Sequence, residues 1–199
     1  MEAKFISTFK NYVEESSENI ASLNDPKLHE AYSKSLEIIL DALRKGNKLI
    51  LAGNGGSHSD ACHIAGELVN YFTTPHKAIP VVTLGTNATV STAWANDHSY
   101  ETQLKRELEA IGKPGDVYLA ITTSGKSINI KNSLKLAGSI GIKRIVLASN
   151  KAEENLENDF EILIAPKVSL THKIQETHIV IYHSLCIDIE NNLPKQYVI

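Results

Sequence analysis

Two side chains that could bind a metal or move a proton, His63 and Glu67, follow a glycine-rich turn. The turn, Asn-Gly-Gly-Ser at 54–57, ends an apolar run, and its glycine pair permits positive φ angles and close backbone approach. Ser57 and the amides after it could therefore meet an anion at a helix N-terminus. Residues four apart lie one turn apart on the same helix face, so the His63 imidazole and the Glu67 carboxylate point the same way. An imidazole can bind zinc, and a carboxylate can bind a metal or take up a proton.

Each of these features also has a simpler interpretation. The glycine turn could be purely structural, and its spacing differs from the GxGxxG fingerprint, so no dinucleotide cofactor is predicted. An isolated pair of this kind is more often a surface or core histidine beside a solvated carboxylate. The position of His63 and Glu67 directly behind a possible anion loop favours the chemical interpretation.

A second candidate anion site is the segment Thr-Thr-Ser-Gly-Lys-Ser at 122–127, which places four hydroxyls and one glycine between a predicted strand and a predicted helix. Hydroxyls, backbone amides and the helix dipole could converge there on a phosphate. The spacing is not that of a Walker A loop, so nucleotide hydrolysis is not predicted. One hydroxyl would suffice to cap the helix that begins near Ser127, and the surplus favours a ligand.

Polar residues in two further segments are candidates. The last predicted helix carries Gln175, His178 and His183 within an apolar pattern, and polar groups there require partners. Gln175 and His183 are roughly 12 Å apart along a straight helix axis, so sharing one small site demands long reaches or another subunit. Helix capping and surface histidines are the alternative. Asn96 and Asp97 lie between two helical patterns, where Asp97 could simply cap the next helix.

The elements that must position these residues alternate along the chain. Two helical patterns flank an Asn-Asp-Pro break at 24–26, and five short β-rich runs follow at 48–52, 79–84, 116–122, 144–148 and 160–165. Helical patterns at about 57–72, 88–110, 127–140 and 152–158 separate the strands, and one long helix is expected over about 169–191. This alternation predicts an α/β fold with a parallel sheet covered on both faces. Ligands of such sheets bind beyond the carboxyl ends of the strands.

Composition narrows the class of protein. A chain of 199 residues with 42% hydrophobic and 22% charged residues is expected to fold as one domain. The net charge of −3, without a basic cluster, predicts no nucleic-acid binding. The two cysteines, Cys62 and Cys186, are interpreted as packing residues, and with an N-terminus that lacks a signal-peptide core they favour the cytoplasm. No apolar run approaches the roughly 20 residues that cross a bilayer, so no membrane partner is expected.

Four segments together resemble, in order and spacing, the phosphoheptose isomerases of the sugar-isomerase (SIS) domain family. They are GNGGSHSDACHIAGEL, WANDHSYE, TTSGKS and IQETHIVIYHSLC, and the resemblance covers nearly the whole chain. It implies a three-layer, flavodoxin-like sandwich with a five-stranded parallel sheet, preceded by N-terminal helices. It further implies one SIS domain over 1–199, in which 1–46 contribute to oligomerisation and 47–199 form the core and the C-terminal helix. The implied assembly is a homotetramer with active sites at subunit interfaces.

The resemblance also assigns roles to residues. It implies a zinc ion held by His63, Glu67, Gln175 and His183, with Glu67 as the base and His183 as the acid. The subunit interface is expected to bring the distant ligands together. The implied substrate contacts are Asn54, Gly55, Gly56, Ser57, Glu67, Asn96, Asp97, Thr122, Thr123, Ser124, Ser127 and Gln175.

The implied reaction converts sedoheptulose 7-phosphate into D-glycero-D-manno-heptose 7-phosphate, which supplies heptose for bacterial surface polysaccharides. Some positions depart from the common family pattern: Thr122 stands where serine is frequent, Cys62 where glutamine is, His172 where an acidic or small residue is, and Tyr71 where arginine is. These departures leave open an isomerase of another sugar phosphate. A non-catalytic SIS adaptor or a sugar-phosphate sensor is the alternative from another class.

Overall fold

The computed structural model describes residues 2–199, with side chains from Ile6 onward. Met1, with which the predicted domain begins, lies outside the described residues. Within 2–199, five parallel strands form one sheet in the order β2-β1-β3-β4-β5, the flavodoxin-like order that the resemblance implies. The strands are β1 (Leu49–Ala52), β2 (Val81–Thr83), β3 (Val117–Thr122), β4 (Lys143–Ala148) and β5 (Ile162–Ile164).

The helices surround this sheet, and both N-terminal helices precede it as predicted. They are α1 (Glu2–Ala21), α2 (Pro26–Arg44), α3 (Gly56–Val69), α4 (Ala88–Asp97), α5 (Gln103–Ile111), α6 (Ile128–Ser139) and α7 (Thr171–Asn191), with 3₁₀ helices at Tyr100–Thr102, Asn150–Asn155 and Lys195–Tyr197. None of the helices in 2–199 combines the length and the apolar character that crossing a bilayer requires.

Two predicted helical regions differ from the structure. The region 88–110 is divided, because α4 ends at Asp97 and the Ser99 side chain accepts a hydrogen bond from the Glu101 amide at the start of a new turn. Asp97 therefore closes α4 instead of capping the next helix. The brief helix expected over 152–158 is a 3₁₀ helix that begins earlier, and Glu157 and Asn158 leave it with φ angles of 54° and 57°. Left-handed residues of this kind end a helix.

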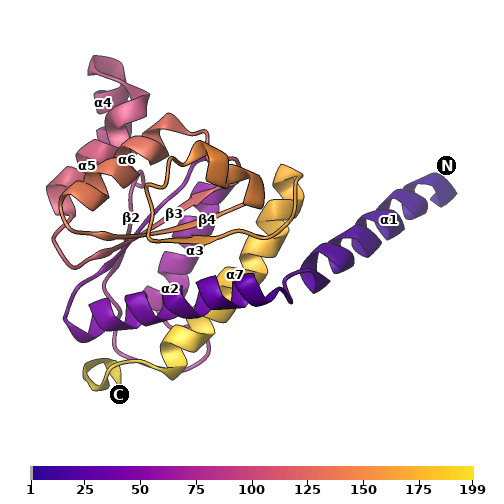
Figure 1. Cartoon of the computed structure of the whole chain (residues 1–199), viewed down its shortest axis with the longest axis horizontal. Coiled ribbons are helices and arrows are strands. Elements are labelled where there is room, and N and C mark those ends of the chain that lie inside the picture. The colour runs from indigo at the N-terminus through magenta and orange to yellow at the C-terminus, as the bar shows by residue number, and fades with distance from the viewer. Residues whose placement is uncertain (1) are drawn as a thin grey trace.

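The sheet separates two hydrophobic clusters, because successive strand residues point to opposite faces. Leu49 and Leu51 of β1 pack with α2, α3 and α7, whereas Ile50 and Ala52 pack with α5 and α6. Figure 1 shows the same division into a sheet with helices above and below it. The predicted three-layer sandwich is confirmed.

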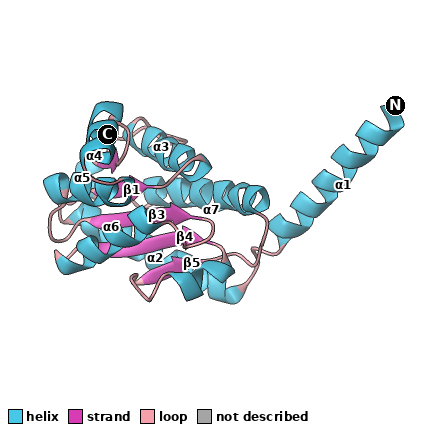
Figure 2. Cartoon of the chain, turned by 90° about the horizontal axis from the view of Figure 1, so that it is seen from above, coloured by secondary structure: helices cyan, strands magenta, loops and turns pink. Residues whose placement is uncertain are grey.

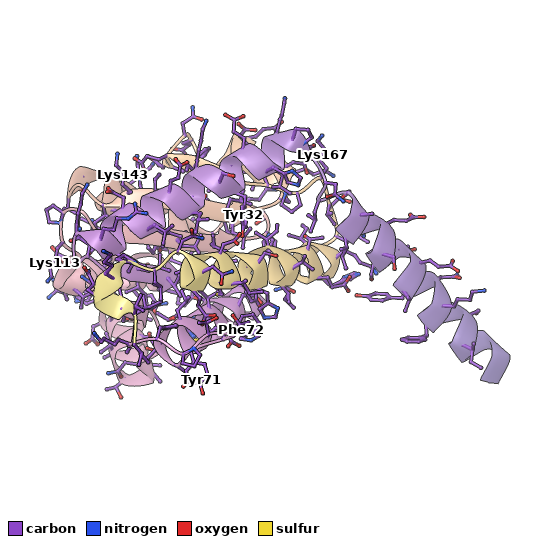
Figure 3. All side chains as sticks on the ribbon, turned by 90° about the horizontal axis from the view of Figure 1, so that it is seen from below. Tyr32, Tyr71, Phe72, Lys113, Lys143 and Lys167 are labelled. Atoms are coloured by element: carbon purple, nitrogen blue, oxygen red, sulfur yellow. The ribbon has the colours of Figure 1, made fainter. Side chains whose placement is uncertain are left out.

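Of the two N-terminal helices, α2 belongs to the outer layer and α1 projects from the body (Figures 1 and 2). Figure 3 shows Tyr32 of α2 between α2 and α7, where its hydroxyl donates to Asp188 at 2.5 Å. The base of α1 is fastened by Lys173 of α7, a lysine only 2% exposed. Its Nζ donates to the Tyr12 carbonyl oxygen at 3.0 Å and to Ser16 Oγ at 2.7 Å. These hydrogen bonds join α1 to α7.

Helices α3 and α7 lie side by side, and each starts beyond the carboxyl end of a strand. His178 ties α7 to the sheet: its Nε2 lies 3.2 Å from the Ala148 carbonyl oxygen at the end of β4. The residue is completely buried, and its Nδ1 has no partner among the described residues. Burial lowers the pKa of His178 to about 4. Protonation of this imidazole therefore works against folding.

The pKa of His178 is 6.5 in the unfolded chain and about 4 in the folded chain. We therefore expect the free energy of unfolding to fall as the pH falls between these two values. In that window His178 binds a proton in the unfolded chain but stays neutral in the folded chain. The resulting loss of stability reaches ~3 kcal/mol at the acid end of the window. Above the window both states are neutral. Urea unfolding at several pH values should show a flatter dependence in His178→Gln than in the wild type or in the exposed control His29→Gln. Equal slopes in all three would contradict this assignment.

Candidate functional site

His63 and Glu67 of α3 meet His183 of α7 within one chain. His63 Nε2 lies 2.8 Å from Glu67 Oε1, and one ligand atom from each of the three residues lies within 4.8 Å of the others. Two imidazole nitrogens and a carboxylate oxygen are a donor set that suits zinc and similar divalent ions. These residues thus form a group that could hold a metal. His183 reaches the other two residues within one chain.

His183 lies in a partly apolar setting. Its ring stacks on Phe72 at 5.1 Å between centroids and meets the His63 ring edge-on at 5.0 Å. Burial, followed by the nearby His63, lowers the pKa of His183. Its Nε2 is buried without a hydrogen-bond partner among the described residues. A buried, neutral and unpartnered nitrogen is suited to a metal ion or to a ligand oxygen.

Gln175, the remaining predicted ligand, lies against the glycine turn. A side chain at Gly56 would come within 2.1 Å of Gln175 Nε2, so it would displace the end of the Gln175 side chain. Gly55 has a φ of 56°, which glycine adopts at little cost. The structure therefore gathers three predicted ligands in one cluster and places the fourth beside the turn, two turns earlier on α7.

Asn54 is held by two residues that the sequence analysis did not single out. Its Oδ1 accepts hydrogen bonds from the Tyr100 hydroxyl at 2.8 Å and from Asn129 Nδ2 at 2.9 Å, and its own Nδ2 donates to Asn129 Oδ1 at 2.9 Å. Both acceptor positions of the side-chain carbonyl oxygen are thus used, and one N–H hydrogen of the Asn54 side-chain amide remains for a ligand. Asn129 follows the 122–127 segment by two residues, and this proximity in sequence is the feature that could have identified it as a site residue.

The segment that carries Asn96 and Asp97 adjoins this region through Tyr100. Asn96 Nδ2 donates to Asp97 Oδ1 at 2.8 Å, and both residues are exposed at the end of α4. Helix α4 buries none of its residues and stands away from the body in Figure 1. Within the single chain, these two predicted substrate contacts bind each other and are not gathered into the cluster.

The 122–127 segment opens on a cleft of 520 Å³ between the ends of β3 and β4 and the start of α7. Thr123, Ser124 and two lysines, Lys126 and Lys151, are among its lining residues. Ser127 occupies the N-cap position of α6, yet its side chain makes no capping hydrogen bond. Capping therefore does not account for this hydroxyl. Hydroxyls, lysines and helix N-termini around one cleft are suited to an anion such as phosphate.

Thr122 and Ser57 are placed differently from the other predicted contacts. The Thr122 hydroxyl accepts a hydrogen bond from the Gly125 amide at 3.3 Å, and the residue is 5% exposed. Ser57 is likewise 5% exposed, and its carbonyl oxygen would lie 2.3 Å from a side chain at Gly53. Both residues shape the turns that border the site.

Phe72, which stacks on His183, belongs to the 70–76 segment, and a buried carboxylate binds that segment. Glu190 of α7 accepts hydrogen bonds from the Phe72 amide at 2.5 Å, the Thr73 amide at 2.9 Å and the Thr74 amide at 3.2 Å. Its side chain is 0% exposed, and Figure 3 shows Phe72 close to α7 with Tyr71 farther out. Glu190 thereby holds the Phe72 ring on His183. The sequence offered no signal for this contact, which joins residues more than a hundred positions apart.

Comparison with known proteins finds phosphoheptose isomerases among the relatives of this chain. The model of the SIS domain matches residues 8–149. A phosphoheptose isomerase from Clostridium acetobutylicum is 39% identical over 191 residues, covering 92% of this chain and 96% of that protein. One from Aquifex aeolicus is 41% identical over 149 residues, covering 75% of this chain and 78% of that protein. The solved structure of a phosphoheptose isomerase from Francisella tularensis is 27% identical, with a TM-score of 0.87 over 94% of this chain and 98% of that chain.

Proposed function

Because the chain belongs to the SIS domain family, and within it to the phosphoheptose isomerases, we propose that it converts sedoheptulose 7-phosphate into D-glycero-D-manno-heptose 7-phosphate. The observation that carries the proposal is the meeting of a carboxylate, Glu67, with a neutral imidazole, His183, in one cluster. An aldose–ketose isomerase needs a base and an acid of this kind on either side of the reacting carbons.

The reaction requires two proton transfers. Glu67 takes a proton from the hydroxymethyl carbon beside the ketone, while the N–H of His183 donates to the carbonyl oxygen, and an enediol results. Return of the proton from Glu67 to the former carbonyl carbon, with transfer of the proton on the terminal oxygen to His183, gives the aldose and restores both residues. A neutral imidazole can serve as the hydrogen-bond donor to such an oxygen. The lowered pKa of His183 is consistent with this role.

The metal in this proposal is zinc, held by His63, Glu67 and His183, with Gln175 as the fourth ligand. When bound, zinc would supply Lewis-acid chemistry at this cluster. The unpartnered Nε2 of His183 and the N/O donor set support this assignment.

The sugar phosphate is proposed to extend from the cluster to the 520 Å³ cleft. Thr123, Ser124 and Ser127 hold the phosphate there, and its binding free energy positions the distant reacting carbons. The glycine turn, with Asn54 and Gln175, borders the sugar between these two ends, and Asn96 and Asp97 are expected to contact it.

We further propose a homotetramer in which α1 packs on another subunit. Phe9 is 72% exposed and Ile6 66% exposed on this projecting helix, and Val13 extends the same face at 45%. In proteins most of the stability of a helix comes from packing of its apolar face, and an exposed apolar face of this kind marks an interaction surface. Multi-angle light scattering measures the mass of the assembly directly. The cytoplasmic location stays a prediction from the sequence.

The test of the function is incubation with sedoheptulose 7-phosphate, with and without a chelator, followed by NMR and mass spectrometry of the product. We expect an aldoheptose 7-phosphate, loss of its formation on chelation, and recovery with zinc. Unphosphorylated sedoheptulose should react with a much lower kcat/KM, because the cleft has no anion to bind. Absence of product together with specific binding of a protein partner would favour the adaptor alternative. Faster turnover of another sugar phosphate would overturn the substrate assignment.

A further inference from the structure

Behind His63 lies a polar pair that the proposed reaction does not use. The Tyr182 hydroxyl is 3.0 Å from His63 Nδ1, on the side of the ring opposite Glu67. Asp60, one turn before His63 on α3, lies near the same hydroxyl: burial and the nearby Asp60 carboxyl both raise the pKa of Tyr182. Asp60 is 8% exposed, and its Oδ2 has no partner among the described residues. Tyr182, His63 and Glu67 therefore form a hydrogen-bonded row, and the Asp60 carboxylate lies next to its Tyr182 end.

The direction of the hydrogen bonds along this row decides what His63 can bind. If Tyr182 donates to Nδ1, the imidazole hydrogen sits on Nε2, and that nitrogen can only donate to Glu67. If Tyr182 donates to Asp60, its oxygen accepts the Nδ1 hydrogen, and the Nε2 lone pair is free for a cation. In the second arrangement a lone pair faces the Glu67 carboxylate at 2.8 Å, and a cation between the two relieves their repulsion. A buried carboxylate that needs a donor favours this second arrangement.

We propose that Tyr182 and Asp60 are a positioning pair, which holds His63 in the tautomer that leaves Nε2 free to bind a divalent metal. Metal-bound histidines commonly donate their other N–H to a carboxylate or carbonyl. Here a tyrosine hydroxyl stands between the histidine and the carboxylate. This proposal rests on the metal site of the proposed function, and it does not depend on which sugar reacts.

The experiment measures zinc affinity by competition with a chromophoric chelator, in the full chain and without sugar. Tyr182→Phe and Asp60→Asn are each expected to weaken zinc binding by roughly 10- to 100-fold. The double variant should bind no more weakly than either single variant, because the two residues act as one unit. Tyr32→Phe is the matched control, because it removes a hydroxyl that donates to a carboxylate away from His63, that of Asp188 on α7. It should leave zinc affinity unchanged.

A second measurement separates positioning from loss of structure. In the zinc-loaded protein, ¹⁵N-edited NMR should show the His63 Nδ1–H hydrogen protected from exchange, with protection lost in Tyr182→Phe and Asp60→Asn. Thermal unfolding of the metal-free variants checks that each is folded, and Asp60→Asn carries the test if Tyr182→Phe is not. Zinc affinity equal to that of Tyr32→Phe, or losses that multiply in the double variant, would overturn the proposal. Because no substrate is present, these outcomes are separate from success or failure of the isomerase assay.

Discussion

Replacing Glu67 with glutamine is expected to lower kcat by roughly 10²- to 10⁴-fold, the usual contribution of a general base. Glutamine keeps the size of the side chain and an oxygen near His63, but it cannot take a proton from carbon at neutral pH. The measurement is turnover of sedoheptulose 7-phosphate at saturating zinc. A parallel experiment in D₂O should show deuterium entering the wild-type product at the reacting carbon, with little entering in Glu67→Gln.

The matched control is Glu109→Gln on α5. Glu109 is an exposed carboxylate paired with Arg106 at 2.9 Å, and the structure gives it no contact with the cluster. Its loss should leave kcat within a factor of two or so, as is usual for surface pairs. If Glu67→Gln exchanges solvent deuterium as fast as the wild type, Glu67 is not the base.

The second large effect is expected in His183→Gln, in which kcat should again fall by roughly 10²- to 10⁴-fold. Glutamine can donate a hydrogen bond from its amide, but it lacks the imidazole that passes a proton between the two oxygens. Zinc affinity should fall as well, because a nitrogen ligand is lost from the group of three. Steady-state kinetics and chelator competition on the same preparation measure both quantities.

His29→Gln provides the control for this change. His29 is an exposed histidine on α2, and its replacement should alter neither kcat nor zinc affinity. Melting temperatures of both variants establish that they are folded. Near-normal turnover in His183→Gln would remove His183 from the acid role, whatever its effect on zinc.

Much of the fold could be predicted because local signals agreed with one another. The Asp25–Pro26 break is an example: Asp25 accepts a hydrogen bond from the Lys27 amide, and Pro26 opens α2. Strand positions followed from apolar runs that are buried on both faces, as the complete burial of β3 shows. The pairing of His63 with Glu67 followed from helical spacing alone.

The remaining features depend on contacts that no local pattern encodes. The hydrogen bond between His63 and Tyr182 joins α3 to a helix at the other end of the chain, and so does the packing of Gln175 on Gly56. The same contacts explain why His183 reaches the cluster within one chain: α3 and α7 pack side by side, which helical periodicity does not reveal. Asp60 could have been noticed, since it stands one turn before His63 on the same helix.

Helix α7 contacts several parts of the candidate site. This unbroken helix borders the 520 Å³ cleft through Thr171 and Ile174, touches the glycine turn through Gln175, supplies His183, and binds the 70–76 segment through Glu190. A helix is stiff along its axis, so these points shift together or not at all. In the proposed function, the distance between the phosphate end and the proton-transfer end of the site is therefore set along one helix, and this distance selects the chain length of the sugar phosphate that reacts.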